Sequence, residues 1–404
     1  MSVFLKDLDK VYRYEDLLYR INYSSVYKPC IQTSDLYDFF TNFLLGLVSD
    51  SPLVLLDADL NFSELSGLNV REINIEKSVV KKQYATLEDL VKAVQTSLSE
   101  ITIFTSGTTG QPKQVRHTVP TLTRSVRIGA GYRGQVWGFA YNPTHMAGLQ
   151  VFFQAFENLN TLVNIFNRSR SEVNAVLESA AITHLSATPT FYRLLLPVEK
   201  AFEKVQRVTL GGEKSDRKLY DFIRQLFPCA RINNVYASTE AGSLFAARGE
   251  NFQIPENLSG KFRVEDSELL IHKSLLGESG SFQYSGDYYR TGDLIEWVDE
   301  SKGIFRFKSR KNELVNTGGY KVNPEEVEAV LLQLEGVQQA VVYGKPNSVL
   351  GNVLCAELKV LPGMELTELQ IRRYLQGKLQ DFKIPRRIKF VEQFLLTRTG
   401  KIKR

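Results

Sequence analysis

Residues 104–113 read FTSGTTGQPK and follow the apolar residues Ile101 and Ile103. The stretch combines hydroxyl side chains, glycines and one lysine, Lys113. Hydroxyls and glycine amides can donate hydrogen bonds to phosphate oxygens, and a lysine adds positive charge. The spacing differs from the common phosphate-loop motif G-x-x-x-x-G-K-[ST], because Lys113 follows Gln-Pro rather than glycine. Taken alone, the stretch fits an ordinary loop as well as a nucleotide site.

The composition around this stretch is that of an ordinary globular protein. The chain has 404 residues, of which 43% are hydrophobic and 24% charged, so it can bury substantial cores. This length predicts two or more domains. The net charge of +5 is small for the size and indicates at most a mild preference for anionic ligands, not a nucleic-acid-binding protein.

Cysteine and histidine usage gives no sign of a metal framework. Cys30, Cys229 and Cys355 lie far apart without a C-x-x-C pair, which is typical of a reduced compartment, and the four histidines lack H-E-x-x-H spacing. The N-terminal residues mix charges with apolar positions, and no segment approaches the ~18 apolar residues that cross a bilayer. We therefore expect a soluble cytoplasmic protein without a structural zinc site.

Short β-rich runs alternate with helical patterns over most of the chain. Strands are predicted at 53–56, 135–140 and 205–210, with helices at 171–179 and 189–196. This alternation predicts an α/β fold with strands backed by helices. The sequence GAGYRG at 129–134 matches G-x-G-x-x-G, but a probable helix precedes it and a strand follows, so a helix-to-strand turn is the better interpretation.

The C-terminal part has a different pattern. Short strands and turns begin near residue 287, and Asn323-Pro324 followed by two acids predicts a helix start. Strands are predicted at 340–343 and 353–360, and Thr367 to Gln370 forms a capping-box sequence. We predict a large N-terminal domain, 1–311, and a small α+β domain, 312–404.

Four further stretches change the interpretation of residues 104–113. They are LGGE at 210–213, NVYASTE at 234–240, YRTGDL at 289–294 and TGKIK at 399–403. In this order the chain, from about residue 101 to its end, resembles the adenylate-forming superfamily: acyl- and aryl-CoA synthetases, peptide-synthetase adenylation domains and firefly luciferase. In motif style it is most similar to AMP-forming acyl-CoA synthetases. The resemblance implies a large N-terminal domain and a small, mobile C-terminal domain.

The resemblance assigns ATP-binding roles to matching residues. Glu240 would hold Mg²⁺, Thr239 would contact the α-phosphate, and Asp293 and Arg310 would contact the ribose. The phosphate loop would comprise Thr105, Ser106, Gly107, Thr108, Thr109, Gly110 and Lys113. The adenine pocket would comprise Gly211, Gly212, Glu213 and Tyr236, with the tyrosine ring stacked on the base.

The resemblance also implies a two-step reaction. A carboxylic acid attacks the α-phosphate of ATP, giving an acyl adenylate and pyrophosphate, and a thiol then displaces AMP. Lys401 would bridge the acid and ATP in the first step. The C-terminal domain would rotate about a hinge at Asn312, and Gly318 and Gly319 would line a tunnel for the thiol's pantetheine arm. The implied cofactors are ATP, Mg²⁺ and CoA, or a carrier protein's phosphopantetheine.

The choice of acid depends on residues 142–148, NPTHMAG. These resemble the histidine motif of acyl- and aryl-CoA synthetases, which favours an acid without a free α-amine. His145 would contact the acid, although a backbone-satisfied histidine is an alternative. His184 is interpreted as structural, and the helical spacing of Phe152, Phe153 and Phe156 favours core packing.

The sequence departs from the family pattern in several places. Gln114, Ala237 and Ser309 replace glycines, Asn312 replaces an acid, and only about one hundred residues precede the phosphate loop, so the first subdomain is expected to be abridged. The leading hypothesis is an acid–thiol ligase that uses CoA. A stand-alone enzyme that loads a carrier protein, and a nucleotide-binding protein without activity, remain alternatives.

Overall fold

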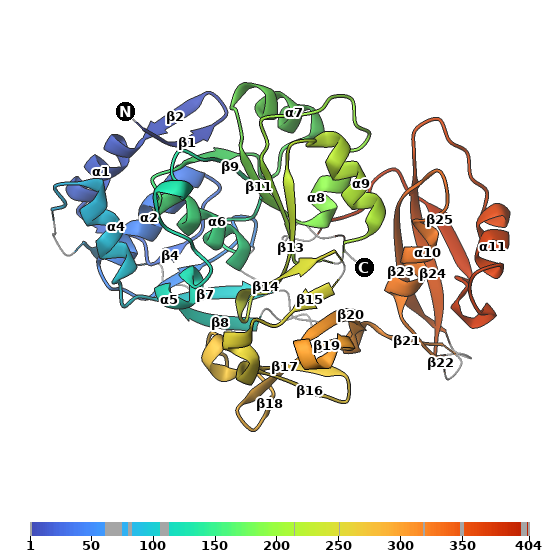
Figure 1. The fold of residues 1–404 in the computed structure, drawn as a ribbon. Helices are drawn as coiled ribbons and strands as arrows, with labels where there is room; N and C mark the ends of the chain where they lie inside the picture. Colours follow the sequence, from blue (N-terminus) through green and yellow to red (C-terminus); the bar gives the residue numbers. More distant parts are fainter. Residues whose placement is uncertain are drawn as a thin grey trace. The chain divides into compact units, whose positions relative to one another are not determined.

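The computed structural model describes residues 2–60, 75–79, 83–105, 113–213, 215–249, 251–317, 320–347, 351–396 and 402 (Figure 1). It divides into two compact units that are interleaved in sequence. The first unit comprises Met1–Gly249 and Ile271–Tyr289, and the second comprises Glu250–Leu270 and Arg290–Arg404. Both units mix helices and strands, and the predicted α/β fold class is confirmed.

The first unit is built on six neighbouring parallel strands. Two of these strands lie within the runs predicted as strands at 135–140 and 205–210, apart from one residue at the end of the second. In spatial order they are β1 (Val3–Asp7), β10 (Thr161–Asn164), β9 (Val136–Phe139), β11 (His184–Ala187), β12 (Arg207–Gly211) and β13 (Arg231–Ser238). The antiparallel strands β2 (Lys10–Arg13) and β14 (Gly242–Arg248) pair with β1 and β13.

Helices connect the parallel strands, as parallel pairing requires. They are α6 (Met146–Phe156) after β9, α7 (Arg170–Ser179) after β10, α8 (Pro189–Leu194) after β11 and α9 (Arg217–Leu226) after β12. After β10 the chain returns to the other side of β9 to form β11, so the strand order reverses between β9 and β11. In open α/β sheets, ligands bind outside the carboxyl ends of the strands at such a reversal.

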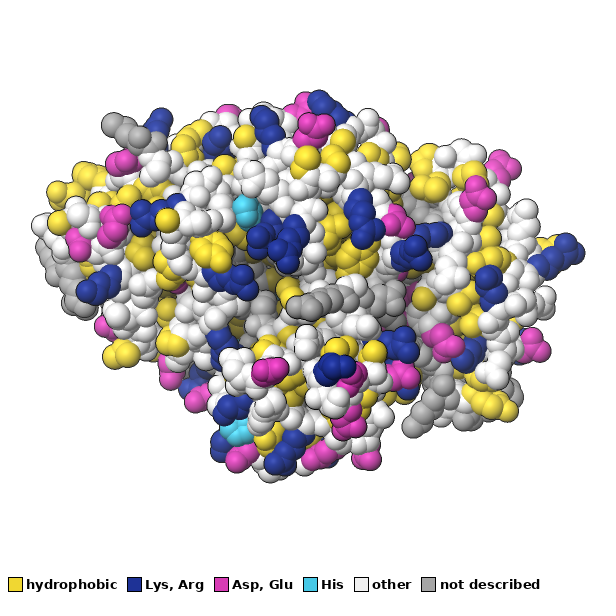
Figure 2. Space-filling model, in the orientation of Figure 1, with side chains coloured by type: hydrophobic (Ala, Val, Ile, Leu, Met, Phe, Trp, Pro, Cys, Tyr) yellow, Lys and Arg dark blue, Asp and Glu magenta, His cyan; other side chains and the backbone are white. Residues whose placement is uncertain are grey.

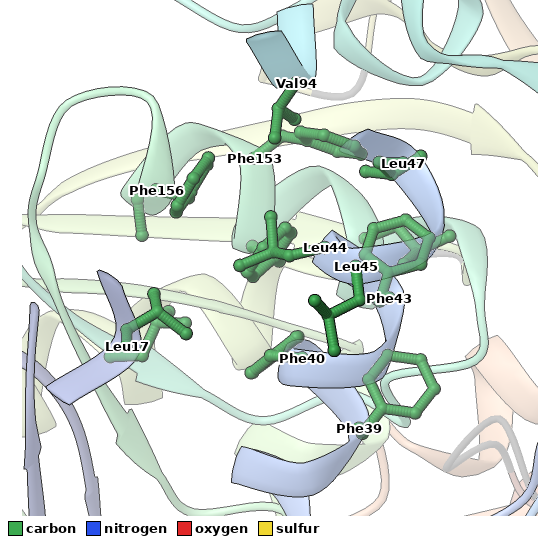
Figure 3. Close-up of a cluster of buried hydrophobic side chains, with 14 of the residues drawn as sticks. Leu17, Phe39, Phe40, Phe43, Leu44, Leu45, Leu47, Val94, Phe153 and Phe156 are labelled. Carbon is green, nitrogen blue, oxygen red and sulfur yellow. The ribbon is translucent and has the colours of Figure 1, made fainter. Parts of the chain in front are cut away.

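The two faces of this sheet have separate cores. Residues of α7, α8 and α9 share one buried cluster, whereas α6 packs with N-terminal helices in another. In the α6 cluster, Phe152 stacks on Phe40 with 4.4 Å between ring centroids, and Phe153 and Phe156 are fully buried (Figure 3). The prediction that these phenylalanines belong to the core is confirmed.

The N-terminal segments of the first unit form a second, smaller sheet. It contains β4 (Cys30–Ile31), β5 (Leu53–Leu55), β7 (Glu100–Thr105) and β8 (Lys113–Thr118). Strands β3 (Val26–Tyr27) and β6 (Lys77–Ser78) pair separately, and β18 (Tyr284–Ser285) is a short later strand. The helices are α1 (Tyr14–Tyr23), α2 (Leu36–Val48), α4 (Leu87–Gln95) and α5 (Val119–Thr123).

The second unit begins with antiparallel strands. They are β15 (Asn251–Gln253), β16 (Phe262–Glu265), β17 (Glu268–His272), β19 (Tyr288–Asp299) and β20 (Ile304–Arg310). Strand β20 pairs with both β15 and β19. The unit boundaries fall inside β17 and β19. The boundary predicted at 311/312 lies within a 3₁₀ turn, Lys311–Glu313, of this unit.

A five-stranded sheet with two helices completes the second unit. The strands are β21 (Val315–Thr317), β22 (Tyr320–Val322), β23 (Val337–Asn347), β24 (Gly351–Val360) and β25 (Arg387–Phe390). Helix α10 (Pro324–Leu331) begins after Asn323, whose side chain accepts from Glu325 N, and α11 (Glu368–Gln376) begins with the predicted Thr367–Gln370 capping box. Both predicted helix starts are confirmed.

Two further features are the distribution of surface charge and the structure of the GAGYRG sequence at 129–134. On the face drawn in Figure 2, Lys and Arg side chains are spread among Asp and Glu, in line with the small net charge. Ala130–Tyr132 forms a 3₁₀ turn between α5 and β9, which confirms a helix-to-strand connection at GAGYRG. Within the described ranges, no helix is long and apolar enough to cross a membrane.

Candidate active site

Predicted site residues follow three of the parallel strands in the first unit. His145 follows β9, Gly211 to Glu213 end and follow β12, and Thr239 with Glu240 follow β13. Because the strands are parallel, their carboxyl ends meet at one edge of the sheet, beside the reversal between β9 and β11. The fold thus brings together residues that are nearly one hundred positions apart.

Local geometry favours glycine at both positions at the end of β12. A Cβ atom on Gly211 would lie 3.1 Å from Val235 Cγ2, and Gly212 has φ of +80°, a conformation that favours glycine. The Glu213 carboxylate accepts hydrogen bonds from Thr190 N at 2.9 Å and Thr190 Oγ1 at 3.1 Å. Glu213 therefore satisfies donors in the first turn of α8 and fixes the β12 loop against it.

Aromatic side chains line the same region. Tyr236 lies on β13 and stacks against Phe245 of β14, with 5.1 Å between centroids and 13° between planes. Tyr141, just after β9, is buried; its hydroxyl lies 3.5 Å from Ser186 Oγ on β11, and burial raises its pKa. These contacts fix Tyr236 and Tyr141 near the strand ends.

Thr239 and Glu240 lie in a three-residue hairpin loop. Strands β13 and β14 pair up to Ser238 and Gly242, which leaves Thr239–Ala241 as the loop. Ser238 Oγ accepts from Ala241 N at 3.2 Å, and Gly242 has φ of +68°. A tight loop of this kind allows the Thr239 and Glu240 side chains few positions.

His145 is held by an aspartate that the sequence analysis missed. His145 Nε2 lies 3.1 Å from Asp57 Oδ1, which also accepts from Asn142 Nδ2 at 2.9 Å and from the Thr144 hydroxyl. The Asp57 side chain is only 13% exposed. Its place directly after the predicted strand 53–56 is a signal that could have identified it.

His184 occupies the opposite end of its strand. It is the first residue of β11, is buried, and lies 4.9 Å from the Trp137 ring. Burial lowers the pKa of His184 to about 4, with a further contribution from Arg207. These features agree with the structural interpretation of this histidine.

The other predicted residues of the phosphate loop, hinge and thiol tunnel lie at the borders of the described ranges or outside them. Thr105 and Lys113 pair across β7 and β8 at the two ends of the phosphate-loop segment, and the Asn312 backbone lies in the turn Lys311–Glu313. Gln114, Ala237 and Ser309 lie on β8, β13 and β20. The predicted residues outside the described ranges are Ser106, Gly107, Thr108, Thr109, Gly110, Gly318, Gly319 and Lys401.

In the second unit, the structure pairs the two residues assigned to the ribose. Asp293 and Arg310 are opposite each other on β19 and β20, and Arg310 Nε donates to Asp293 Oδ1 at 2.9 Å. Buried Glu268 accepts from Gly292 N at 2.9 Å and lies 3.4 Å from Lys311 Nζ. The Glu268 carboxylate thus contacts Gly292, which precedes Asp293, and Lys311, which precedes Asn312.

The acids present fit a phosphate-bound magnesium ion better than a dedicated metal cage. Within the described residues, no group of three or more His, Cys, Asp or Glu side chains could hold a metal. Mg²⁺ is often bound by one or two carboxylates together with substrate phosphates. Glu240 beside Thr239 supplies such a carboxylate.

The fold is that of an α/β protein, and the predicted site residues of its first unit gather at the carboxyl ends of a parallel sheet. The chain matches the AMP-binding enzyme family over residues 66–262 and the AMP-binding enzyme C-terminal domain over residues 326–401. It therefore belongs to the family of AMP-binding enzymes, the adenylate-forming superfamily. The family predicted from the motifs is confirmed.

Curated relatives include ligases and synthases. The chain is 26% identical to 4-hydroxybutyrate–CoA ligase 1 of Metallosphaera sedula, over 75% of this chain and 61% of that protein. It is 24% identical to 2-succinylbenzoate–CoA ligase of Listeria monocytogenes, over 84% of this chain and 79% of that protein. It also matches tyrocidine synthase 3 of Brevibacillus parabrevis at 26% identity, over 75% of this chain and 5% of that protein. The chain thus spans less than two thirds of some relatives.

Solved structures share the fold along the whole chain. ATP-bound MatB from Rhodopseudomonas palustris aligns with a TM-score of 0.76 at 16% identity, covering 99% of this chain and 94% of that chain. The o-succinylbenzoate CoA synthetase of Bacillus subtilis, in complex with the acyl adenylate OSB-AMP, aligns with a TM-score of 0.72 at 18% identity, with the same coverage.

Proposed function

We propose that this protein is an AMP-forming carboxylic acid–thiol ligase. It activates an acid that lacks a free α-amine with ATP and transfers the acyl group to CoA. The observation that supports this most is the arrangement of His145, Gly211–Glu213 and Thr239–Glu240 at the sheet edge where the strand order reverses. Membership of the AMP-binding enzyme family supports the nucleotide assignment.

In the first step, a carboxylate oxygen of the acid attacks the α-phosphorus of ATP. A new bond forms between that oxygen and phosphorus, the bond to the bridging oxygen breaks, and pyrophosphate leaves. Lys113 and the glycine- and hydroxyl-rich stretch before it would bind the β- and γ-phosphates, and Lys401 would offset charge on the transferring group. Bound at Glu240, Mg²⁺ would supply further positive charge at the phosphates.

The remaining predicted residues would bind and orient the adenine and ribose of ATP and the acid. Tyr236 and Gly211–Glu213 would hold the adenine, and Asp293 with Arg310 would hold the ribose, since an ionised carboxylate can accept hydrogen bonds from two neighbouring hydroxyls. Asp57 accepts a hydrogen bond from Nε2 of His145, and this bond would hold the imidazole where the acid is proposed to bind. In the second step the thiol attacks the acyl carbon and AMP leaves with the bridging oxygen.

Thiol transfer rests on the expected hinge. Rotation of residues 312–404 about Asn312 would bring Gly318 and Gly319 to the pantetheine arm, with the division at 311/312 as the working domain boundary. All three cysteines are unpaired in the structure, which fits the expected reducing, cytoplasmic setting. Relatives named CoA ligases favour CoA over a carrier protein as the acceptor.

An acid-dependent pyrophosphate-release screen tests the proposal. Fatty, aryl and amino acids are each supplied with ATP and Mg²⁺, with and without CoA, and with a phosphopantetheinylated carrier protein in place of CoA. The proposal expects release with a subset of non-amino acids and faster turnover with CoA. Acceptance only of amino acids, or acyl transfer only to the carrier protein, would contradict it.

A further inference from the structure

The loop that contains Thr239 and Glu240 is held from outside its own hairpin. Each backbone carbonyl of the loop Thr239–Ala241 accepts a hydrogen bond from elsewhere in the first unit. The donors and acceptors are His117 Nε2 to Thr239 O (2.8 Å), Gly277 N to Glu240 O (2.8 Å) and Arg124 Nη1 to Ala241 O (3.4 Å). Every carbonyl group of this three-residue loop is therefore held by a donor from outside the hairpin.

His117 makes the shortest side-chain contact in this set and is packed tightly. It is 2% exposed, and a Cβ atom on Gly277 would lie 2.5 Å from its Cε1, so a larger residue at 277 would displace the ring. Its Nδ1 lies 3.2 Å from Thr121 Oγ1. Burial, with a smaller contribution from Arg124, lowers the pKa of His117 to about 4. At neutral pH the imidazole is uncharged, and Nε2 carries the proton that Thr239 O accepts.

The strand that carries His117 begins at the phosphate-loop lysine. Strand β8 runs from Lys113 to Thr118, and its fifth residue is His117. The hydrogen bond to Thr239 therefore links the strand that leaves the phosphate loop to the hairpin loop after β13. A rigid strand on one side and a three-residue loop on the other fix the distance between Lys113 and the Thr239–Glu240 pair.

We propose that His117, supported by Arg124, is a positioning residue for the nucleotide and its magnesium ion. By holding the Thr239 carbonyl, it sets the peptide planes on which the Thr239 hydroxyl and the Glu240 carboxylate depend, and keeps both in register with Lys113. This inference rests on the proposed nucleotide site. It assigns His117 no contact with the substrate.

The physical reason is the cost of an unpaired carbonyl. If the buried His117 loses its donor, the carbonyl oxygen of the half-buried Thr239 faces an apolar side chain and has to turn toward another partner or water, which rotates the peptide between Thr239 and Glu240. Gln can place an amide N–H near the position of Nε2 and so replace the donor. Leu has similar bulk without a donor.

The test compares His117→Leu with His117→Gln by calorimetric titration of a non-hydrolysable ATP analogue in the presence of Mg²⁺. His117→Leu is expected to bind about tenfold more weakly than wild type, whereas His117→Gln should stay within about threefold. His184→Leu is the matched control, because it also removes a buried histidine but at the other end of the sheet. It should lower the melting temperature without changing the dissociation constant.

Three results would overturn the inference: unchanged binding by His117→Leu, equal losses in the Leu and Gln variants, or an equal loss in His184→Leu. If His117→Leu does not fold, Arg124→Met replaces it in the same titration, where weaker binding supports the inference and unchanged binding overturns it. Analogue binding and pyrophosphate release by the wild-type protein test the proposed function separately. If wild type neither binds the analogue nor releases pyrophosphate, the proposed function fails, and this inference fails with it.

Discussion

At the scale of single residues, Asp57 organises the loop proposed to bind the acid. One carboxylate oxygen accepts from side chains of Asn142, Thr144 and His145, all of which follow β9. If the carboxylate were removed, Asn142 and His145 would lose these bonds, and the Thr144 hydroxyl would keep only Asn142 Oδ1 as an acceptor. An amide at this position would keep one acceptor oxygen but lose the negative charge that strengthens the three hydrogen bonds, and its NH2 group would add donors of its own.

Asp57→Asn tests this arrangement. We expect KM for the acid to rise about tenfold with little change in KM for ATP, and stability to fall by about 1–3 kcal/mol, because three hydrogen bonds to a charged oxygen become weaker bonds to a neutral one. Asp7→Asn is a matched control, since Asp7 is also a carboxylate after a buried strand segment, but its partners Arg168 and Asn164 are not predicted site residues. Equal effects of both variants on KM for the acid would show that Asp57 acts only through stability.

Lys401→Ala separates the two half-reactions. The variant should lose most acid-dependent pyrophosphate release but largely retain thiol transfer from a supplied acyl adenylate, because the lysine is assigned to the first step alone. Rapid-quench assays of each half-reaction provide the measurement. Equal loss in both halves would remove Lys401 from the assigned role.

Roles could be predicted only for residues that lie within a recognisable sequence motif. The order of LGGE, NVYASTE and YRTGDL predicted a nucleotide site, and the structure pairs Asp293 with Arg310, the two residues that we predict to contact the ribose. Asp57 and His117 escaped prediction because their partners lie 85 and 122 positions away. Such contacts depend on tertiary packing, which local sequence patterns do not report.

At the scale of elements, the start of α6 positions His145 and the loop before it. Helix α6 begins after His145, and Gly148 in its first turn packs against the preceding loop. A Cβ atom on Gly148 would lie 2.3 Å from Asn142 O and 3.2 Å from Pro143 Cα. Because these are backbone atoms, a larger residue would have to move the loop that carries the Asp57 partners.

Gly148→Ala therefore couples stability to acid binding. We expect a loss of about 1–3 kcal/mol in the free energy of unfolding, as for other overpacked sites, and a raised KM for the acid. Gly131→Ala is the control, because its Cβ would meet no atom within 4 Å. Chemical denaturation of both variants gives the comparison, and a neutral Gly148→Ala would contradict the close packing.

Element boundaries followed from capping and proline chemistry. Asn323 and Thr367 cap the helices that their sequences predict. Helix α8 ends at Leu194, two residues earlier than predicted, and the reason is Pro197, which disfavours helical geometry at Leu196. The β13–β14 hairpin was not predicted, because its loop residues matched a functional motif and gave no turn signal.

At the scale of the whole molecule, the order of strands could not be predicted from sequence. Alternating strands and helices indicated an α/β fold, but the reversal between β9 and β11 arises from non-local pairing. The interleaving of Glu250–Leu270 and Ile271–Tyr289 between the two units has the same origin. The location of the site at a sheet edge therefore required the structure.

Two buried histidines predict the pH dependence of stability. Burial lowers the pKa values of His117 and His184 to about 4, from 6.5 when exposed. The unfolded chain then binds more protons between these pH values, so the free energy of unfolding is highest above pH ~6.5 and falls as the pH approaches ~4. The loss is on the order of 3 kcal/mol for His117 and smaller for the more exposed His184. Denaturant titrations at several pH values measure this slope.

The control for the pH prediction is His184→Phe, which keeps a ring against Trp137 but cannot take up a proton. Its stability should fall less steeply than that of wild type over the same pH interval. An identical slope in both proteins would show that His184 does not contribute to the acid sensitivity.

The central claim is that an oxygen of the acid becomes bonded to the α-phosphorus of ATP. Mass spectrometry of the nucleotide product tests this directly, using an accepted acid labelled with oxygen-18 in its carboxyl group and CoA as the thiol. The account predicts AMP that carries one labelled oxygen, together with unlabelled pyrophosphate. Unlabelled AMP, or ADP with the label in inorganic phosphate, would contradict it.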